Sequence, residues 1–80
     1  MADILIVSLA KRKETAVKVQ EVFTDFGCLI KIRLGLHENN NACADNGIII
    51  LELVSAAEKI YEFTKKLENI EGVKVKFVSI

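Results

Sequence analysis

The sequence predicts an α+β fold in which two amphipathic helices cover one face of an antiparallel four-stranded sheet. Residues 47–54 (GIIILELV) and 3–7 (DILIV) are short, β-branched apolar runs, which are typical of strands in the middle of a sheet. Two other stretches alternate apolar and polar residues, as strands near a sheet edge do. Two more repeat apolar residues at helical spacing. Along the chain these segments follow the order β-α-β-β-α-β.

The first helix is expected over residues 13–26. Its apolar positions fall at i, i+3, i+7 and i+10, which places them on one face; they are Ala16, Val19, Phe23 and Phe26. Gly27 follows the last of them. We therefore predict that Gly27 ends the helix in the left-handed conformation that glycine adopts most easily.

Residues 28–36 form the next predicted strand, and they alternate throughout. The alternation assigns Cys28, Ile30, Ile32, Leu34 and Leu36 to one face, and Leu29, Lys31, Arg33 and Gly35 to the other. Residues 37–46 (HENNNACADN) contain three consecutive asparagines, which favour turns. These residues should be the tip of a hairpin that leads directly into residues 47–54.

The second helix should begin at Ser55, because Ser55 and Glu58 have the spacing of a capping box. It should run to about Asn69, with its apolar residues again at helical spacing; they are Ile60, Phe63, Leu67 and Ile70. In the last segment Val73, Val75 and Phe77 alternate with Lys74, Lys76 and Val78. Lysines on such a strand are typical of a sheet edge.

The predicted order of elements is that of the ferredoxin-like βαββαβ sandwich. Its usual sheet order is 4-1-3-2, with strands one and three in the centre. The two most apolar runs of this chain are strands one and three, so pattern and topology agree. We predict a single domain over residues 1–80.

The composition limits the classes of function. Eleven basic and eleven acidic side chains give a net charge of zero, which argues against nucleic-acid binding through bulk charge. An apolar content of 51% is too high for a disordered chain. No run of apolar residues is long enough to span a membrane, and the first residues do not resemble a signal peptide. Cys28 and Cys43 form no CxxC motif, so we expect reduced thiols and a cytoplasmic protein.

The sheet face without helices is the main clue to function. Glu52 should point to this open face, because an unpaired carboxylate in the core is too costly. Ile48, Ile50 and Val54 then lie beside it, and strand one adds either Ile4 and Ile6 or Leu5 and Val7. A soluble monomer rarely exposes an apolar patch of that size. We therefore expect an oligomer interface at Ile48, Ile50, Glu52 and Val54, with a polar rim of Lys31, Arg33, Lys74 and Lys76.

Two stretches carry a resemblance to a known family. Residues 67–75 (LENIEGVKV) resemble the end of ACT domains, where a helix closes and enters the last strand. Residues 33–37 (RLGLH), the acidic loop after them and residues 47–51 (GIIIL) are similar to small stand-alone ACT-like proteins described as regulators of iron-only hydrogenase systems. Those proteins are related in fold to the C-terminal domain of nickel-responsive regulators. The resemblance implies a non-enzymatic, ligand-sensing regulator that forms a homodimer or homotetramer.

The resemblance does not extend to known ligand sites. ACT domains often place a glycine in the first strand–helix loop, where an amino acid docks, and this loop has none. Nickel regulators use several histidines, whereas this chain has one, His37. For a small-molecule effector we expect Ser8, Lys11, Arg12, Arg33 and His37 to be the ligand-binding residues. The first three precede a helix N-terminus, which attracts anions, although an ordinary polar turn is the favoured interpretation because the loop is not glycine-rich.

Two other functions remain open. In a metal-responsive module, His37 with Cys43 or Asp45 would supply the ligands; a solvated hairpin tip is the simpler interpretation. A nucleic-acid-associated protein could use the lysines and Arg33 on the sheet. That function is disfavoured, because strands one and three lack the aromatic residues that stack on bases. We predict no cofactor and no catalysis, since the chain has no nucleophile–base pair or paired-carboxylate motif at a recognised spacing.

Overall fold

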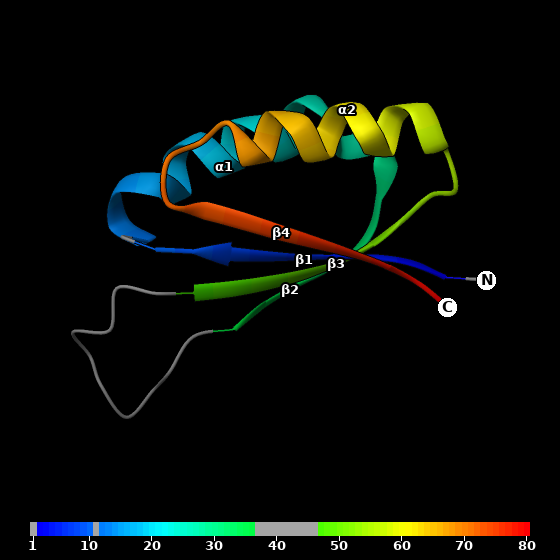
Figure 1. Cartoon of the computed structure of the whole chain (residues 1–80), viewed down its shortest axis with the longest axis horizontal. Coiled ribbons are helices and arrows are strands. Elements are labelled where there is room, and N and C mark those ends of the chain that lie inside the picture. The colour runs from blue at the N-terminus through cyan, green and yellow to red at the C-terminus, as the bar shows by residue number, and fades with distance from the viewer. Residues whose placement is uncertain (1, 11, 37–46) are drawn as a thin grey trace.

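The protein is described by a computed structural model that covers residues 2–10, 12–36 and 47–80. Figure 1 shows two helices lying side by side above a sheet of four strands. The elements, in chain order, are β1 (Asp3–Leu9), α1 (Arg12–Asp25), the short 3-10 helix η1 (Gly27–Leu29), β2 (Ile30–Leu36), β3 (Gly47–Leu53), α2 (Ala57–Glu68) and β4 (Val73–Ser79).

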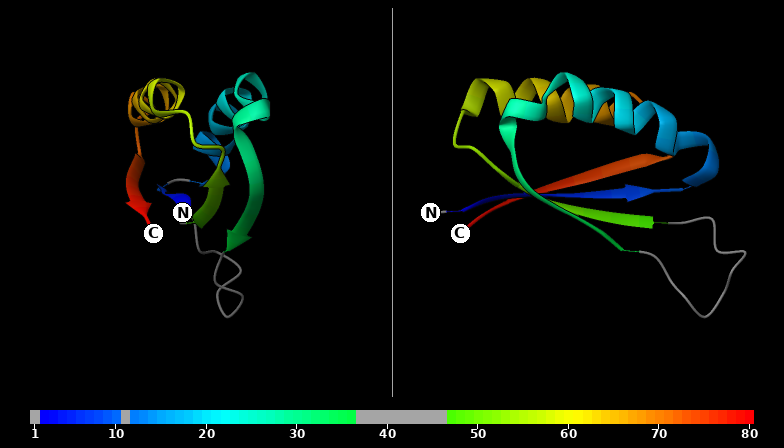
Figure 2. Two further views of the ribbon diagram at one scale, coloured as in Figure 1. Left: turned by 90° about the vertical axis from the view of Figure 1, so that its right-hand side faces the viewer. Right: turned by 180° about the vertical axis from the view of Figure 1, so that it is seen from behind.

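The strands form one sheet in the order β2-β3-β1-β4, and each neighbouring pair is antiparallel. The end-on view in Figure 2 shows that both helices cover the same face of the sheet. The predicted ferredoxin-like fold, with order 4-1-3-2 and β1 and β3 in the centre, is confirmed. Within the described residues, neither helix is long and apolar enough to cross a membrane.

The two central strands alternate strictly between the core and the open face. Leu5 and Val7 of β1 are fully buried under the helices, as is Leu51 of β3. Leu5 pairs with Leu51, whereas Ile6 pairs with Ile50 on the opposite side of the sheet. Of the two alternatives for strand one, the structure therefore selects the one in which Ile4 and Ile6 face outward.

The helices complete the core with the apolar faces that their spacing predicts. Val19 and Phe23 of α1 are buried, and so are three residues of α2, namely Ile60, Phe63 and Leu67. Phe63 is the largest fully buried side chain, and its ring lies 5.9 Å from that of Phe23 and 5.1 Å from that of Phe26. This aromatic cluster joins the two helices to each other and to the sheet.

A bulge at the start of β2 changes which residues share a face. Ile30 pairs with Leu53 and Ile32 pairs with Glu52, so Lys31 is an extra residue on this strand. Ile30 consequently packs against the core, whereas Ile32 lies on the open face. The predicted alternation over residues 28–36 is thus wrong before the bulge: Cys28 and Leu29 belong to η1, and Ile30 does not share a face with Ile32.

The capping box predicted at the second helix is also wrong. The N-cap of α2 is Ala56, which has no side chain that could accept a hydrogen bond. The Ser55 hydroxyl instead donates a 3.0 Å hydrogen bond to the carboxylate of Asp3, which also accepts one from Ser79. Ser55 therefore ties the β3–α2 connection to β1, and the first amides of α2 have no side-chain cap.

The left-handed glycine is Gly72, not Gly27. Gly27 begins η1, and Gly72 in the turn before β4 has a φ of +87°. The Gly72 carbonyl accepts a 2.7 Å hydrogen bond from the Ala10 amide, so the turn is fastened to the end of β1. A Cβ atom on Gly72 would lie 3.1 Å from the Ala10 carbonyl oxygen, whereas one on Gly27 would have no neighbour within 4 Å.

Gly72→Val should therefore destabilise the fold and Gly27→Val should not. At Gly72 a β-branched side chain meets both a disfavoured φ and the backbone of Ala10, which should cost about 1–3 kcal/mol. At Gly27 the change should stay within about 0.5 kcal/mol. Urea unfolding of the two variants beside the natural protein measures both values. Equal losses would contradict the placement of these two turns.

Candidate functional sites: an open sheet face and an interhelix pocket

The open face of the sheet is covered with aliphatic side chains. Leu34, Ile50 and Ile6 form one row across β2, β3 and β1. A second row contains Ile32, Glu52, Ile4 and Val78. Ile32, Leu34 and Ile48 are 59%, 52% and 44% exposed, which is high for large aliphatic residues. We define the open-face patch as Ile4, Ile6, Ile32, Leu34, Ile48, Ile50 and Val78.

Polar groups border this patch on two sides. The Lys31 ammonium lies 3.4 Å from the Glu52 carboxylate on the β2 side. Lys74 and Lys76 follow on β4, opposite Ser8 and Ile6, and neither forms an ion pair within the described part of the chain. The prediction that Glu52 faces outward is confirmed, and its partner Lys31 belongs to the predicted rim.

Two predicted members of this surface lie elsewhere. Arg33 pairs with Leu51 on the helix side of the sheet, and its guanidinium lies 5.1 Å from the centre of the Phe23 ring. The bulge at Lys31 is the reason, because it shifts the alternation of β2 by one residue. Val54 follows the end of β3 and lines a pocket beside the helices, so it does not continue the outward-facing series of Ile48 and Ile50.

The residues expected to bind an effector do not form one site in the part of the chain that the structure describes. Ser8 is exposed on the open face near Lys74, whereas Arg33 lies on the opposite side of the sheet. Arg12 is the first residue of α1. Lys11 and His37 lie outside the described residues. Their role in ligand binding stays a prediction.

The metal-responsive alternative rests on the same hairpin tip. His37, Cys43 and Asp45 all lie outside the described residues, so the structure does not test this alternative. Elsewhere, in residues 2–10, 12–36 and 47–80, no three side chains of histidine, cysteine or acidic type lie together as metal ligands would. The metal hypothesis therefore still depends on the tip alone.

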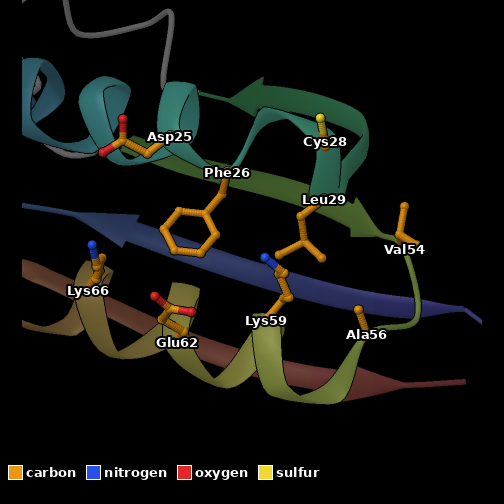
Figure 3. A pocket seen from close by; sticks show the side chains of 9 residues that line it. All are labelled: Asp25, Phe26, Cys28, Leu29, Val54, Ala56, Lys59, Glu62 and Lys66. Atoms are coloured by element: carbon orange, nitrogen blue, oxygen red, sulfur yellow. The ribbon is translucent and has the colours of Figure 1, made fainter.

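A pocket of about 500 Å³ opens at the junction of the two helices. Figure 3 shows it between the C-terminal end of α1 with η1 on one side and α2, from Lys59 to Lys66, on the other. Its apolar walls come from two distant segments of the chain, and they are formed by Phe26, Leu29, Val54 and Ala56. Cys28 is at the edge of this pocket, and Figure 3 shows its exposed thiol pointing away from Leu29 and Lys59. A volume of this size is ordinary for small-molecule sites.

Charged side chains surround the apolar walls. Lys59, Glu62 and Lys66 follow one another along α2, and Asp25 faces them from α1. None of these four takes part in an ion pair with the described residues. The Lys66 ammonium lies 5.7 Å from the centre of the Phe26 ring, which is the range of a cation–π contact. We call this site the interhelix pocket.

Sequence reasoning did not find this pocket. Its residues lie in two stretches separated by more than twenty positions, and no spacing or motif connects them. Periodicity assigns Phe26 to the core and Val54 to the open face, and neither assignment indicates a pocket.

Comparison with known proteins identifies structures with the same fold, but it does not assign the chain to a family. No family model matches the sequence, and no curated protein is significantly similar to it. The structure is similar to that of an uncharacterised protein from Thermotoga maritima, with a TM-score of 0.84 and 28% sequence identity over 96% of this chain and 92% of that one.

The ACT domain of a GTP pyrophosphokinase from Chlorobium tepidum is also similar. Its crystal structure has a TM-score of 0.67 and 24% identity, with 96% of this chain and 95% of that one covered. Its solution structure has a TM-score of 0.66 and 23% identity, covering 99% of this chain and 85% of that one. The ACT-like fold expected from residues 67–75 is therefore confirmed.

Proposed function

We propose that this protein is a non-enzymatic regulatory domain of the ACT-like type, which acts as a homo-oligomer and senses a small molecule. The observation that carries the proposal is the open-face patch on an ACT-like fold. Seven aliphatic side chains occupy the middle of a sheet face, with lysines at the border. A contiguous apolar surface of this kind marks an interaction site.

A second copy of the chain is the partner that fits this face best. Base stacking requires aromatic side chains, and the described residues place none on the open face. An aliphatic face can meet itself across a two-fold axis, since the same patch on each copy then contacts its counterpart. The bordering lysines would then remain in water at the rim, as polar groups do around interfaces.

The mass of the untagged protein tests the oligomer. Native mass spectrometry should show a dimer or tetramer of the 8.9 kDa chain, together with any small molecule that purifies with it. A monomer at tens of micromolar would contradict the proposal, because a stable interface of ordinary size binds well below that concentration.

The regulated system is taken from the sequence resemblance to regulators of iron-only hydrogenase systems. If it is correct, cells that lack this protein should show altered hydrogenase activity, and the natural chain should restore it. Unchanged hydrogenase activity would contradict the proposed link to a hydrogenase system. The proposal of an oligomeric regulatory domain would not be affected, because native mass spectrometry tests it separately.

A further inference from the structure

We propose that the interhelix pocket binds a small organic anion, with the anionic group at Lys59 and an aromatic or aliphatic body against Phe26 and Leu29. This inference rests on the proposed ligand-sensing role and adds the place and the chemistry of the ligand. The pocket lies between the helices, whereas the open-face patch lies on the other side of the sheet. The two surfaces can therefore be tested separately.

The apolar walls of the pocket indicate that most of the ligand is apolar. Phe26 and Leu29 form one wall, and Val54 with Ala56 closes the end near the start of α2. The Phe26 side chain is held in place on its core side, because its ring packs against the ring of the buried Phe63. A rigid aromatic wall of this kind favours a flat apolar group, which gains from stacking as well as from burial.

The charged groups at one end of the pocket indicate that the polar group of the ligand is an anion. Figure 3 shows the Lys59 side chain extending from α2 toward Leu29, into the middle of the pocket. Its ammonium has no ion-pair partner among the described residues. It is close in sequence to the start of α2, where Ser55 is engaged by Asp3 and the first amides have no side-chain cap. Both features make this end of the pocket positive, so a carboxylate, sulfonate or phosphate belongs there.

The opposite end of the pocket carries charges of both signs. Asp25 and Glu62 line it without ion-pair partners in the described chain, α1 ends there with the negative side of its dipole, and the ammonium of Lys66 is engaged by the Phe26 ring. A ligand with one anionic head and a neutral body avoids these carboxylates. The size of the pocket, about 500 Å³, suits such a molecule and is too small for a folded partner.

Cys28 provides a local reporter for occupancy. The chain has two cysteines, so Cys43→Ser leaves the exposed Cys28 thiol at the pocket edge as the single reactive site. The probe is anilinonaphthalene sulfonate, an aromatic anion, and the thiol reagent is iodoacetamide, which is small and neutral. Mass spectrometry then follows the rate of alkylation with and without the probe.

We expect the probe at about ten times its Kd to slow Cys28 alkylation several-fold, because the bound probe lies against Leu29, the neighbour of Cys28. Phenylnaphthylamine, which has the same ring system without the sulfonate, should protect much less. Lys59→Glu should weaken protection roughly five- to tenfold. Lys74→Glu, the same charge reversal on the open face, should leave it unchanged.

Three results with the probes and the variants would overturn the proposal. They are no protection by the probe, equal protection by the neutral analogue, and equal loss in Lys59→Glu and Lys74→Glu. Protection that grows with protein concentration in the absence of probe would also overturn it, since a second copy would then occupy the pocket. The comparison of the two probes uses the unaltered Lys59, so it does not depend on how that variant folds. A monomeric protein would refute the proposed oligomer without affecting any of these readouts.

Discussion

Ile50→Lys is expected to convert the proposed oligomer to a monomer that remains folded. Ile50 lies in the middle row of the open-face patch, between Leu34 on β2 and Ile6 on β1. A lysine at this position would place an ammonium group, without a partner, at the centre of an apolar interface. In the free protomer Ile50 is only half-buried and faces away from the core, so a longer side chain can reach water there.

Light scattering after gel filtration measures the outcome. The variant should elute with the mass of one 8.9 kDa chain, and circular dichroism should show unchanged secondary structure. Val17→Lys is the matched control, because it also replaces an aliphatic residue by lysine, at a position of α1 that is 62% exposed. The control should keep the mass of the natural protein. An Ile50→Lys protein of unchanged mass and melting temperature would show that the open face is not the interface.

The alternation of strands was the most reliable guide to this structure. In β3 the burial of every second residue, from Ile49 to Leu53, follows from the need to keep Glu52 in water. The same period failed in β2, where Lys31 is an extra residue. One inserted residue reverses every assignment on one side of it, so Ile30 and Arg33, which were predicted on opposite faces, both lie on the helix side of the sheet. A bulge has no signature in a sequence of evenly alternating residues.

Local motifs failed where distant residues competed for the same groups. Ser55 and Glu58 have capping spacing, but Asp3, far away in sequence, takes the Ser55 hydroxyl. Gly27 has the position of a helix-ending glycine, and a 3-10 turn continues through it instead. The interhelix pocket could not be predicted from the sequence, because it too depends on contacts between distant residues. Its walls exist only after η1 and the start of α2 have been brought together by packing.

Phe63→Ala should remove a large part of the free energy of unfolding. Phe63 is fully buried, and its ring contacts those of Phe23 and Phe26, so truncation leaves a cavity where the two helices meet. Removing such a ring costs about 3–5 kcal/mol. Small domains have about 5–15 kcal/mol in total, so the variant should be close to unfolding. Its melting temperature should fall by roughly 12 °C or more, because each kcal/mol shifts it by about 4–8 °C at this size.

Phe77→Ala is the control for this experiment. Phe77 is 44% exposed at the end of β4, so the same truncation removes much less buried area and should cost about 1 kcal/mol. Both variants should be melted at the same protein concentration as the natural chain, since association with a second copy adds to apparent stability. Equal losses in the two variants would mean that Phe77 is buried too. In that case the edge strand β4, rather than the open face, would be where a second copy binds.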